Sequence, residues 1–107
     1  MRNVDVETLV PESGLVKAAG CLKIMAHPLR LRVAEMLTLG EFTVQQLADT
    51  CGLPHSQMCG HLRLMQNCGL LTSRRDGRSV YYQISSPQLP ALIECVRTSC
   101  GQNDSKG

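Results

Sequence analysis

The sequence predicts a mainly α fold with a small β-hairpin, in the order helix, helix, helix, helix, hairpin, helix. Three observations predict it. Apolar residues recur with the 3.6-residue period of a helix before residue 69 and again after residue 87. Between these stretches the apolar period becomes two, which is typical of strands with one buried face. Glycines at positions 40, 52 and 69 stand where successive helical patterns end.

The first two helices are predicted on either side of Ala26-His27. Pro28 suits the first position of the second helix because its missing N–H needs no partner there. That helix ends before Gly40. The apolar stripe of the first helix contains Leu15, Ala18, Ala19, Leu22 and Met25, and that of the second contains Leu29, Val33, Met36 and Leu37.

The third and fourth helices form a predicted helix-turn-helix. Thr43-Val44-Gln45-Gln46 has the form of a capping box, in which Thr43 caps the helix and Gln46 reaches back. This short helix runs to Cys51 and ends at Gly52, and Pro54-His55-Ser56 begins the next, which Gly69 terminates. Two helices joined by a tight turn containing glycine are typical of helix-turn-helix modules. The inward positions of the fourth helix are Met58, Leu62 and Met65.

A two-stranded wing and a fifth helix complete the pattern. Asp76-Gly77 is a strong hairpin signal between two alternating segments. The alternating residues are Leu71, Ser73, Val80, Tyr82 and Ile84, and the stripe of the last helix contains Leu89, Leu92, Ile93, Val96 and Cys100. We therefore expect one winged helix-turn-helix domain over residues 1–107, with a core from about 12 to 100 and frayed termini.

Composition narrows the class of function. A chain of 107 residues has room for one core, and a homodimer would increase its buried surface. There is no membrane-length apolar run and no apolar signal segment at the start, so we expect a cytoplasmic protein without a membrane partner. No phosphate loop, dinucleotide turn, metalloprotease helix or Cys-x-x-Cys pair occurs, so we expect neither an enzyme nor a required cofactor. The six cysteines (21, 51, 59, 68, 95 and 100) are expected to be reduced thiols.

The basic residues predict a DNA interface. The formal net charge is only +2, but the segment from Cys51 to Ile84 carries four arginines against Asp76. A helix fits the DNA major groove and reads bases from its first turns, while wing arginines meet phosphates or the minor groove. We therefore expect a double-stranded DNA partner. The predicted base-facing residues are His55, Ser56, Gln57 and Cys59; Arg63 is predicted to meet the backbone, and Arg74, Arg75 and Arg78 to make the wing contact.

A series of sequence blocks occurs in order between residues 22 and 84: His27-Pro28-Leu29-Arg30, Gly40-Glu41, Thr43 to Ala48, Cys51-Gly52-Leu53-Pro54, His61 to Met65, Cys68-Gly69-Leu70-Leu71 and Arg75 to Tyr82. With these blocks, residues 22–84 resemble the ArsR/SmtB family of bacterial winged-helix repressors. This resemblance implies a homodimer built mainly from the first and last helices, bound to a palindromic operator. It also implies release from DNA when a metal ion, metalloid or oxidant engages thiols or histidines.

Most sensor sites that the family resemblance suggests lack a ligand in this chain. The last helix has no Asp or His for a zinc site, and the third helix has a lone Cys51 where a Cys-x-Cys pair is needed. The cadmium and lead variant would need a cysteine at Leu64, and the persulfide-sensing dithiol would need one at Glu35. The remaining candidate joins Cys21 to Cys95 and Cys100, whose thiolates suit As(III), Cd(II), Pb(II) or Zn(II), or a persulfide or oxidant.

Several alternatives stay open at this point. Cys100 also fits the apolar stripe of its helix, and packing is the preferred role for Cys51 and Cys68. Cys59 lies one turn after His55 near a helix N-terminus, a setting that favours a reactive thiolate, so oxidation there would obstruct the DNA face. The alternative functions are a winged-helix regulator without a thiol inducer and, in another class, a thiol-based metal-binding protein on the same scaffold.

Overall fold

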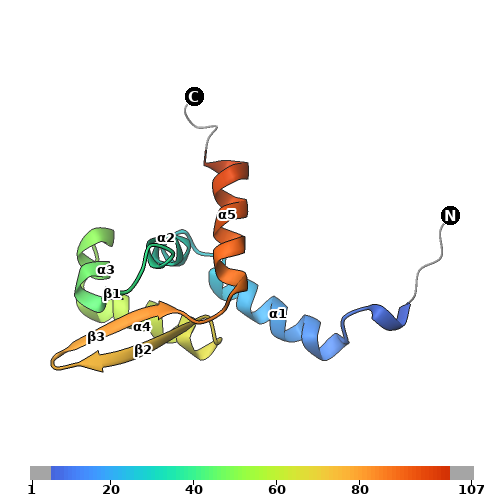
Figure 1. The fold of residues 1–107 in the computed structure, drawn as a ribbon, viewed down its shortest axis with the longest axis horizontal. Coiled ribbons are helices and arrows are strands. Elements are labelled where there is room, and N and C mark those ends of the chain that lie inside the picture. The colour runs from blue at the N-terminus through green and yellow to red at the C-terminus, as the bar shows by residue number, and fades with distance from the viewer. Residues whose placement is uncertain (1–5, 102–107) are drawn as a thin grey trace.

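The computed structural model describes residues 6–101 and confirms the predicted order of helices and hairpin (Figure 1). Two short elements are additional: a 3-10 turn, η1, and a two-residue strand, β1. Of the termini predicted to be frayed, outside about residues 12–100, residues 1–5 and 102–107 lie outside the described residues, whereas Val6–Thr8 form η1. No helix within residues 6–101 has the length and apolar character needed to cross a membrane. The elements are η1 (Val6–Thr8), α1 (Glu12–Met25), α2 (Pro28–Leu37), β1 (Phe42–Thr43), α3 (Val44–Cys51), α4 (His55–Asn67), β2 (Leu71–Asp76), β3 (Ser79–Ile84) and α5 (Gln88–Cys100).

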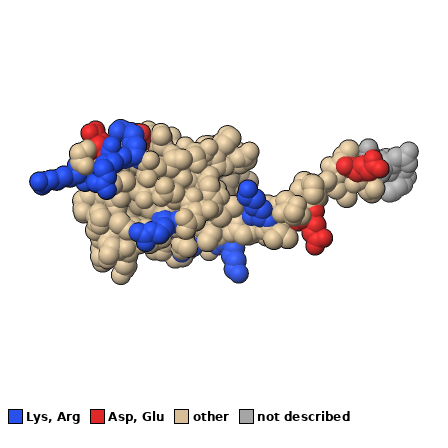
Figure 2. Space-filling model, turned by 90° about the horizontal axis from the view of Figure 1, so that it is seen from below, with Lys and Arg blue, Asp and Glu red and all other residues tan. Residues whose placement is uncertain are grey.

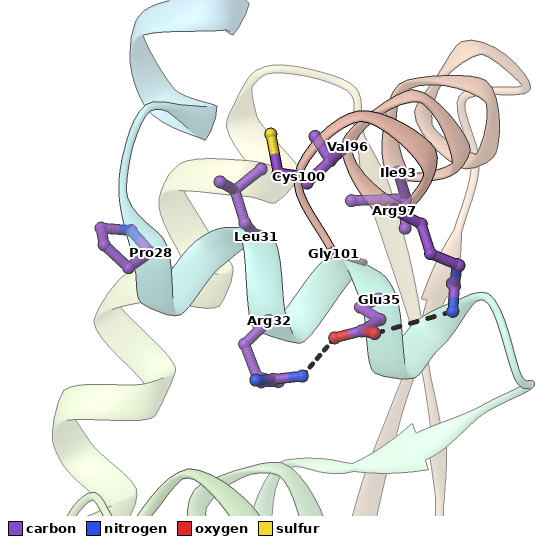
Figure 3. A pocket seen from close by; sticks show the side chains of 9 residues that line it. All are labelled: Pro28, Leu31, Arg32, Glu35, Ile93, Val96, Arg97, Cys100 and Gly101. Atoms are coloured by element: carbon purple, nitrogen blue, oxygen red, sulfur yellow. Dashed lines mark hydrogen bonds and ion pairs between the residues drawn. The ribbon is translucent and has the colours of Figure 1, made fainter. Parts of the chain in front are cut away.

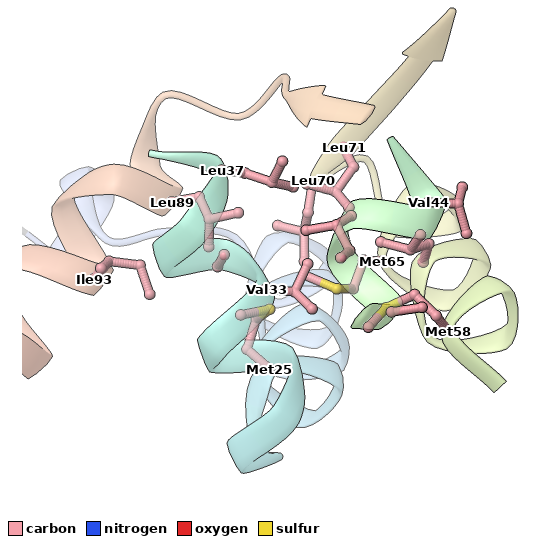
Figure 4. Packing of buried hydrophobic residues seen from close by; sticks show 14 residues of the cluster. Met25, Val33, Leu37, Val44, Met58, Met65, Leu70, Leu71, Leu89 and Ile93 are labelled. Atoms are coloured by element: carbon pink, nitrogen blue, oxygen red, sulfur yellow. The ribbon is translucent and has the colours of Figure 1, made fainter. Parts of the chain in front are cut away.

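The hydrophobic core lies where the helices meet the base of the hairpin. Figure 4 shows the side chains of Met25, Val33 and Met65 converging from α1, α2 and α4. The predicted inward residues of α4 are all fully buried, and α5 adds Leu89 and Ile93. Because these residues pack one face of α4 into the core, the opposite face of the helix is left for solvent or a ligand. The largest fully buried side chains are Leu47, Met58, Leu62, Met65, Leu71 and Val33.

The predicted apolar stripe of α1 is largely exposed. Only Met25, at the end of the helix, is buried in the core. Leu15, Val16 and Leu22 are 56%, 67% and 58% exposed. In Figure 1, α1 extends away from the body of the molecule. The periodicity therefore predicted the helix correctly, but a single chain does not cover its apolar face.

The capping box at the start of α3 is confirmed. The Thr43 hydroxyl accepts from the Gln46 N–H at 3.0 Å, and the Gln46 side chain accepts from the Thr43 N–H at 2.8 Å. Gly52 closes the helix in the left-handed conformation, with φ at 69°. The helix therefore has defined limits at both ends, which fix the turn before α4.

Replacing Thr43 by alanine is expected to lower the free energy of unfolding by about 1 kcal/mol, because the Gln46 N–H loses the hydroxyl that accepts its hydrogen bond. Urea unfolding of the two proteins measures the difference. Thr72→Ala, at an exposed position in β2, is the matched control. Equal losses in the two variants would contradict the capping role.

The wing is part of a three-stranded antiparallel sheet in the order β1-β3-β2. Asp76 pairs with Ser79 across a two-residue turn, in which Gly77 has φ at 66°. A positive φ at the first turn position is typical of the type II′ hairpin and favours glycine. The third strand, β1, pairs Phe42 with Tyr82 and Thr43 with Tyr81. It fixes the wing to the start of α3.

Candidate nucleic-acid interface

A groove separates the first turns of α4 from the wing. Its volume is about 380 Å³, and His55 and Cys59 of α4 face Arg75 and Arg78 of the hairpin across it. The remaining lining residues are Thr43, Val44, Gln45, Ser79, Val80 and Tyr82. The structure thus brings four of the predicted interface residues together on one surface.

The other predicted residues of α4 lie along its solvent face. Ser56 and Gln57 are exposed in the first turn, and Arg63 is exposed two turns later. Met58, between them, is fully buried. The helix therefore presents a polar face from its N-terminus onward while its apolar face packs into the core, which is the geometry that a recognition helix requires.

Arg74 has a structural partner that local sequence reasoning did not identify. Its guanidinium donates to both carboxylate oxygens of Glu41, at 2.7 and 3.1 Å, and lies 4.7 Å from the centre of the Tyr81 ring. The hydrogen bond from Arg74 lowers the pKa of Glu41, and the same contact raises the pKa of Arg74. Arg74 thereby joins the wing to the segment before β1. A DNA contact by Arg74 remains a prediction.

The charge on the wing is consequently more mixed than the local sequence count suggests. Figure 2 shows Lys and Arg gathered at the end of the molecule where the hairpin lies, with acidic side chains beside them. Arg74 is paired with Glu41, whereas Arg75 and Arg78 make no ion pair within residues 6–101. The free positive charge of the wing therefore belongs to Arg75 and Arg78.

Cys59 lies beside a histidine, as its spacing in the sequence predicts. Its Sγ is 3.6 Å from Nδ1 of His55. Nearby, burial raises the pKa of Tyr82, whose hydroxyl donates to the Gln66 side chain at 3.4 Å. The Cys59 side chain is half-buried and lines the groove. That oxidation of Cys59 acts as a signal at the DNA face stays a prediction.

His27, Arg30 and His61 form a polar cluster. It brings together the sequence blocks that begin at His27 and at His61. The ring nitrogen Nδ1 of His27 accepts from the Leu29 N–H at 3.1 Å and so caps α2. Arg30 donates from Nε to His61 Nδ1 at 3.1 Å and from its terminal nitrogen to the Ile24 carbonyl at 3.0 Å. The two histidine rings meet edge to face, 5.1 Å apart. This cluster fixes α4 against the junction of α1 and α2.

Mild acid is expected to destabilise this cluster. Burial, followed by the charges of Arg30 and His27, lowers the pKa of His61. The unfolded chain therefore binds a proton at about pH 6.5, before the folded chain does, and stability falls as pH drops through and below that value. His61→Gln keeps an acceptor for Arg30 without titrating. We expect this variant to lose less stability between pH 7 and 5, measured by urea unfolding, and a pH dependence equal to that of the wild-type protein would contradict the assignment.

The candidate sensor cysteines are distributed over two sites. Cys95 and Cys100 are exposed on α5, whereas Cys21 is half-buried and contacts Cys68. In the described part of a single chain, no group of three or more Cys, His, Asp or Glu residues could hold a metal ion. Cys51 is packed against the core, and burial raises its pKa, in agreement with its expected packing role. A thiol site that unites Cys21, Cys95 and Cys100 therefore remains a prediction about the assembled protein.

Cys100 lies in a cavity of about 500 Å³ between α2 and α5. Figure 3 shows its thiol near Leu31, with Glu35 at the other end of the cavity. Glu35 forms ion pairs with Arg32 and with Arg97, the latter at 3.7 Å. Glu35, the α2 position at which a dithiol sensor would need its second cysteine, thus carries a paired carboxylate and lies away from Cys100.

The fold and this surface define a winged helix-turn-helix domain with a basic groove. HlyU, a transcriptional activator of Vibrio cholerae, is 33% identical over 93 residues, which is 86% of each chain. Its solved structure has a TM-score of 0.80 at 32% identity and covers 86% of this chain and all of that one. The chain belongs to the ArsR/SmtB-type family of winged helix-turn-helix transcriptional regulators. The proteins to which it is similar are named as transcriptional regulators.

Two further proteins extend the comparison. The "Probable mercury resistance operon repressor" of Streptomyces lividans is 26% identical over 81 residues, which span 76% of this chain and 65% of that protein. The homodimeric winged helix-turn-helix DNA-binding domain Mb0332 of Mycobacterium bovis has a TM-score of 0.78 at 24% identity, with 90% of this chain and 89% of that one covered. This last likeness concerns the fold. A scan against protein-family models finds no match.

Proposed function

We propose that this protein is a homodimeric, sequence-specific transcriptional repressor in the cytoplasm, which leaves its operator when its cysteines react with an inducer. The observation that carries the DNA-binding part is the groove in which His55 and Cys59 of α4 face Arg75 and Arg78 of the wing. The exposed first turn of α4 would enter the major groove, and the two unpaired arginines would contact phosphates or the minor groove.

The exposed face of α1 supports the homodimer. Leu15 and Leu22 are seven residues apart and therefore lie on the same side of the helix. Both are more than half exposed, and Val6, Leu9 and Val10 continue the apolar surface towards the N-terminus. Exposed apolar surface of this kind marks an interface. A dimer along α1 and α5 would present two α4 helices to an inverted repeat, with half-sites about one helical turn apart.

The composition supports a thiol inducer. Six cysteines occur in 107 residues, and no disulfide joins them in the described structure. Thiolates bind thiophilic ions such as As(III), Cd(II), Pb(II) and Zn(II), and they also react with persulfides and oxidants. One relative is named for mercury resistance and repression, whereas HlyU is named an activator. Repression is therefore our proposal for this chain, with a regulator lacking a thiol inducer as its first alternative.

Fluorescence anisotropy of the reduced protein on duplex DNA tests this function. The DNA is a site selected from a random duplex library, and the titrants are As(III), Cd(II), Pb(II), Zn(II) and a persulfide. We expect binding that weakens steeply with salt and is lost with at least one titrant. The Cys21→Ser, Cys95→Ser and Cys100→Ser variants should then lose the response. If no titrant changes DNA binding, the proposed thiol inducer is wrong. The alternative, a regulator without a thiol inducer, would then hold.

The thiol-based metal-binding protein is distinguished by the same assay. If metal binding were the function, the Arg75→Ala and Arg78→Ala variants would bind metal ions and DNA as the wild-type protein does. We expect these variants to lose DNA affinity instead.

A further inference from the structure

Two cysteines that are distant in the sequence contact each other behind α4. Cys21 lies on α1, and Cys68 directly follows α4, 47 residues later. The Cys68 thiol donates to Sγ of Cys21, with the two sulfur atoms 2.8 Å apart. The Cys21 thiol in turn donates to the Cys68 carbonyl at 3.4 Å. Both side chains are half-buried.

The backbone holds Cys68 in this position. Gly69, with φ at 81°, reverses the chain after α4. The N–H of Leu70 donates to the Met65 carbonyl at 3.1 Å, and the N–H of Gly69 donates to the Gln66 carbonyl at 2.9 Å. These two bonds form a Schellman motif, which satisfies the last carbonyls of the helix. The sulfur of Cys68 therefore projects from a fixed helix end towards α1.

The pair suits disulfide formation better than metal binding. No third ligand accompanies the two thiols in the described part of the chain. A disulfide needs a separation of about 2.04 Å between the sulfur atoms, so the observed contact closes with a movement of less than about 1 Å. We propose that Cys21 and Cys68 are a reversible oxidation site, at which a hydroperoxide converts the two thiols into a disulfide between α1 and the end of α4.

The chemistry is a balanced two-electron oxidation. The thiolate of Cys21 attacks the peroxide O–O bond, which gives a sulfenic acid on Cys21 and, after proton uptake, water or an alcohol as leaving group. The sulfur of Cys68 then attacks the Cys21 sulfur, loses its proton and expels water. The hydrogen bond to Cys21, followed by burial, raises the pKa of Cys68 to about 11, so Cys68 keeps its proton until this second step. A dithiol reductant restores both thiols by exchange.

The bond would act on the recognition helix. It joins α4, which carries the groove residues, to α1, which carries the exposed apolar face. A dimer must place both α4 helices in successive major grooves, and a covalent tie between α1 and α4 restricts that adjustment. This consequence rests on the proposed function. We expect oxidation to weaken duplex binding at least tenfold.

Peptide mapping of the full chain tests the site. The reduced protein is treated with hydrogen peroxide, its remaining thiols are alkylated, and it is digested with trypsin without reduction. We expect peptides 18–23 and 64–74 to be joined, with the loss of two hydrogen atoms, and to separate after dithiothreitol. The cross-link should also raise the Tm by roughly 10 °C, because it closes a long loop of the unfolded chain.

Three variants make the result decisive. Cys21→Ser and Cys68→Ser should remove the cross-link and the rise in Tm, while Cys95→Ser, which removes an exposed thiol outside the pair, should keep both. Alkylation of Cys21 and Cys68 after peroxide treatment, or a cross-link to any other cysteine, would overturn the site. A cross-link that leaves duplex affinity unchanged would overturn its effect on DNA binding. A cross-link in a protein that binds no DNA in either state would refute the proposed function and leave the oxidation site in place.

Discussion

Replacing both Arg75 and Arg78 by alanine is expected to weaken binding to duplex DNA by about 100-fold or more, because charge-assisted hydrogen bonds to phosphate or base edges are the strong ones. Both side chains line the groove opposite α4, and neither forms an ion pair in the described residues. The fold should be unaffected, since both residues are exposed at the hairpin. Fluorescence anisotropy measures the affinity, and circular dichroism checks the fold.

The salt dependence of this variant identifies the kind of contact. Each phosphate contact contributes about 0.9 to the slope of log K against log salt concentration, so a dimer that loses four such contacts loses up to about 3.6. Arg32→Ala with Arg97→Ala is the matched control, since it removes the same number of charges from α2 and α5. If the control lost as much affinity, net charge would explain the effect and the wing would have no special role.

Leu62→Ala is expected to reduce the free energy of unfolding by about 3 kcal/mol, within the range of roughly 2–5 for buried leucines. Leu62 is fully buried on α4 and belongs to the core cluster that supports the recognition helix. Truncation removes apolar contacts and leaves a cavity that the rigid neighbours do not fill. This loss is a large part of the total stability of about 5–15 kcal/mol of a typical domain.

Leu64 provides the control on the same helix. It has the same side chain but is 40% exposed. Leu64→Ala should cost less than about 1 kcal/mol, because little cavity is created. Urea unfolding of both variants measures the difference. Similar losses at the two positions would contradict the assignment of the inner face of α4.

Local patterns were sufficient to predict the elements of the fold. The capping box at Thr43, the glycines after the helices and the turn at Gly77 act within a few residues, so their signals can be read directly. Strand β1 was missed because two residues are too few to show a period. The stripe of α1 was predicted as an apolar face, but its exposure in one chain could not be, because periodicity identifies an apolar face and does not say which molecule covers it.

The site was only partly predictable for a related reason. Residues of α4 and the hairpin follow one another in the chain, so their meeting in one groove could be anticipated. The contacts between Arg74 and Glu41, 33 residues apart, and between Cys21 and Cys68, 47 residues apart, depend on the packed tertiary structure. No local spacing encodes such pairs.

In the proposed function, a dimer reads DNA with α4 and the wing. Selection of binding sites from a random duplex library, with the reduced protein and its Arg75→Ala/Arg78→Ala variant in parallel, tests it most directly. We expect the wild-type protein to enrich an inverted repeat with half-sites about 10 base pairs apart, or a multiple of that distance, and the variant to enrich none. Enrichment of a site without two-fold symmetry would contradict binding as a symmetric dimer, and equal enrichment by both proteins would contradict the role of the wing.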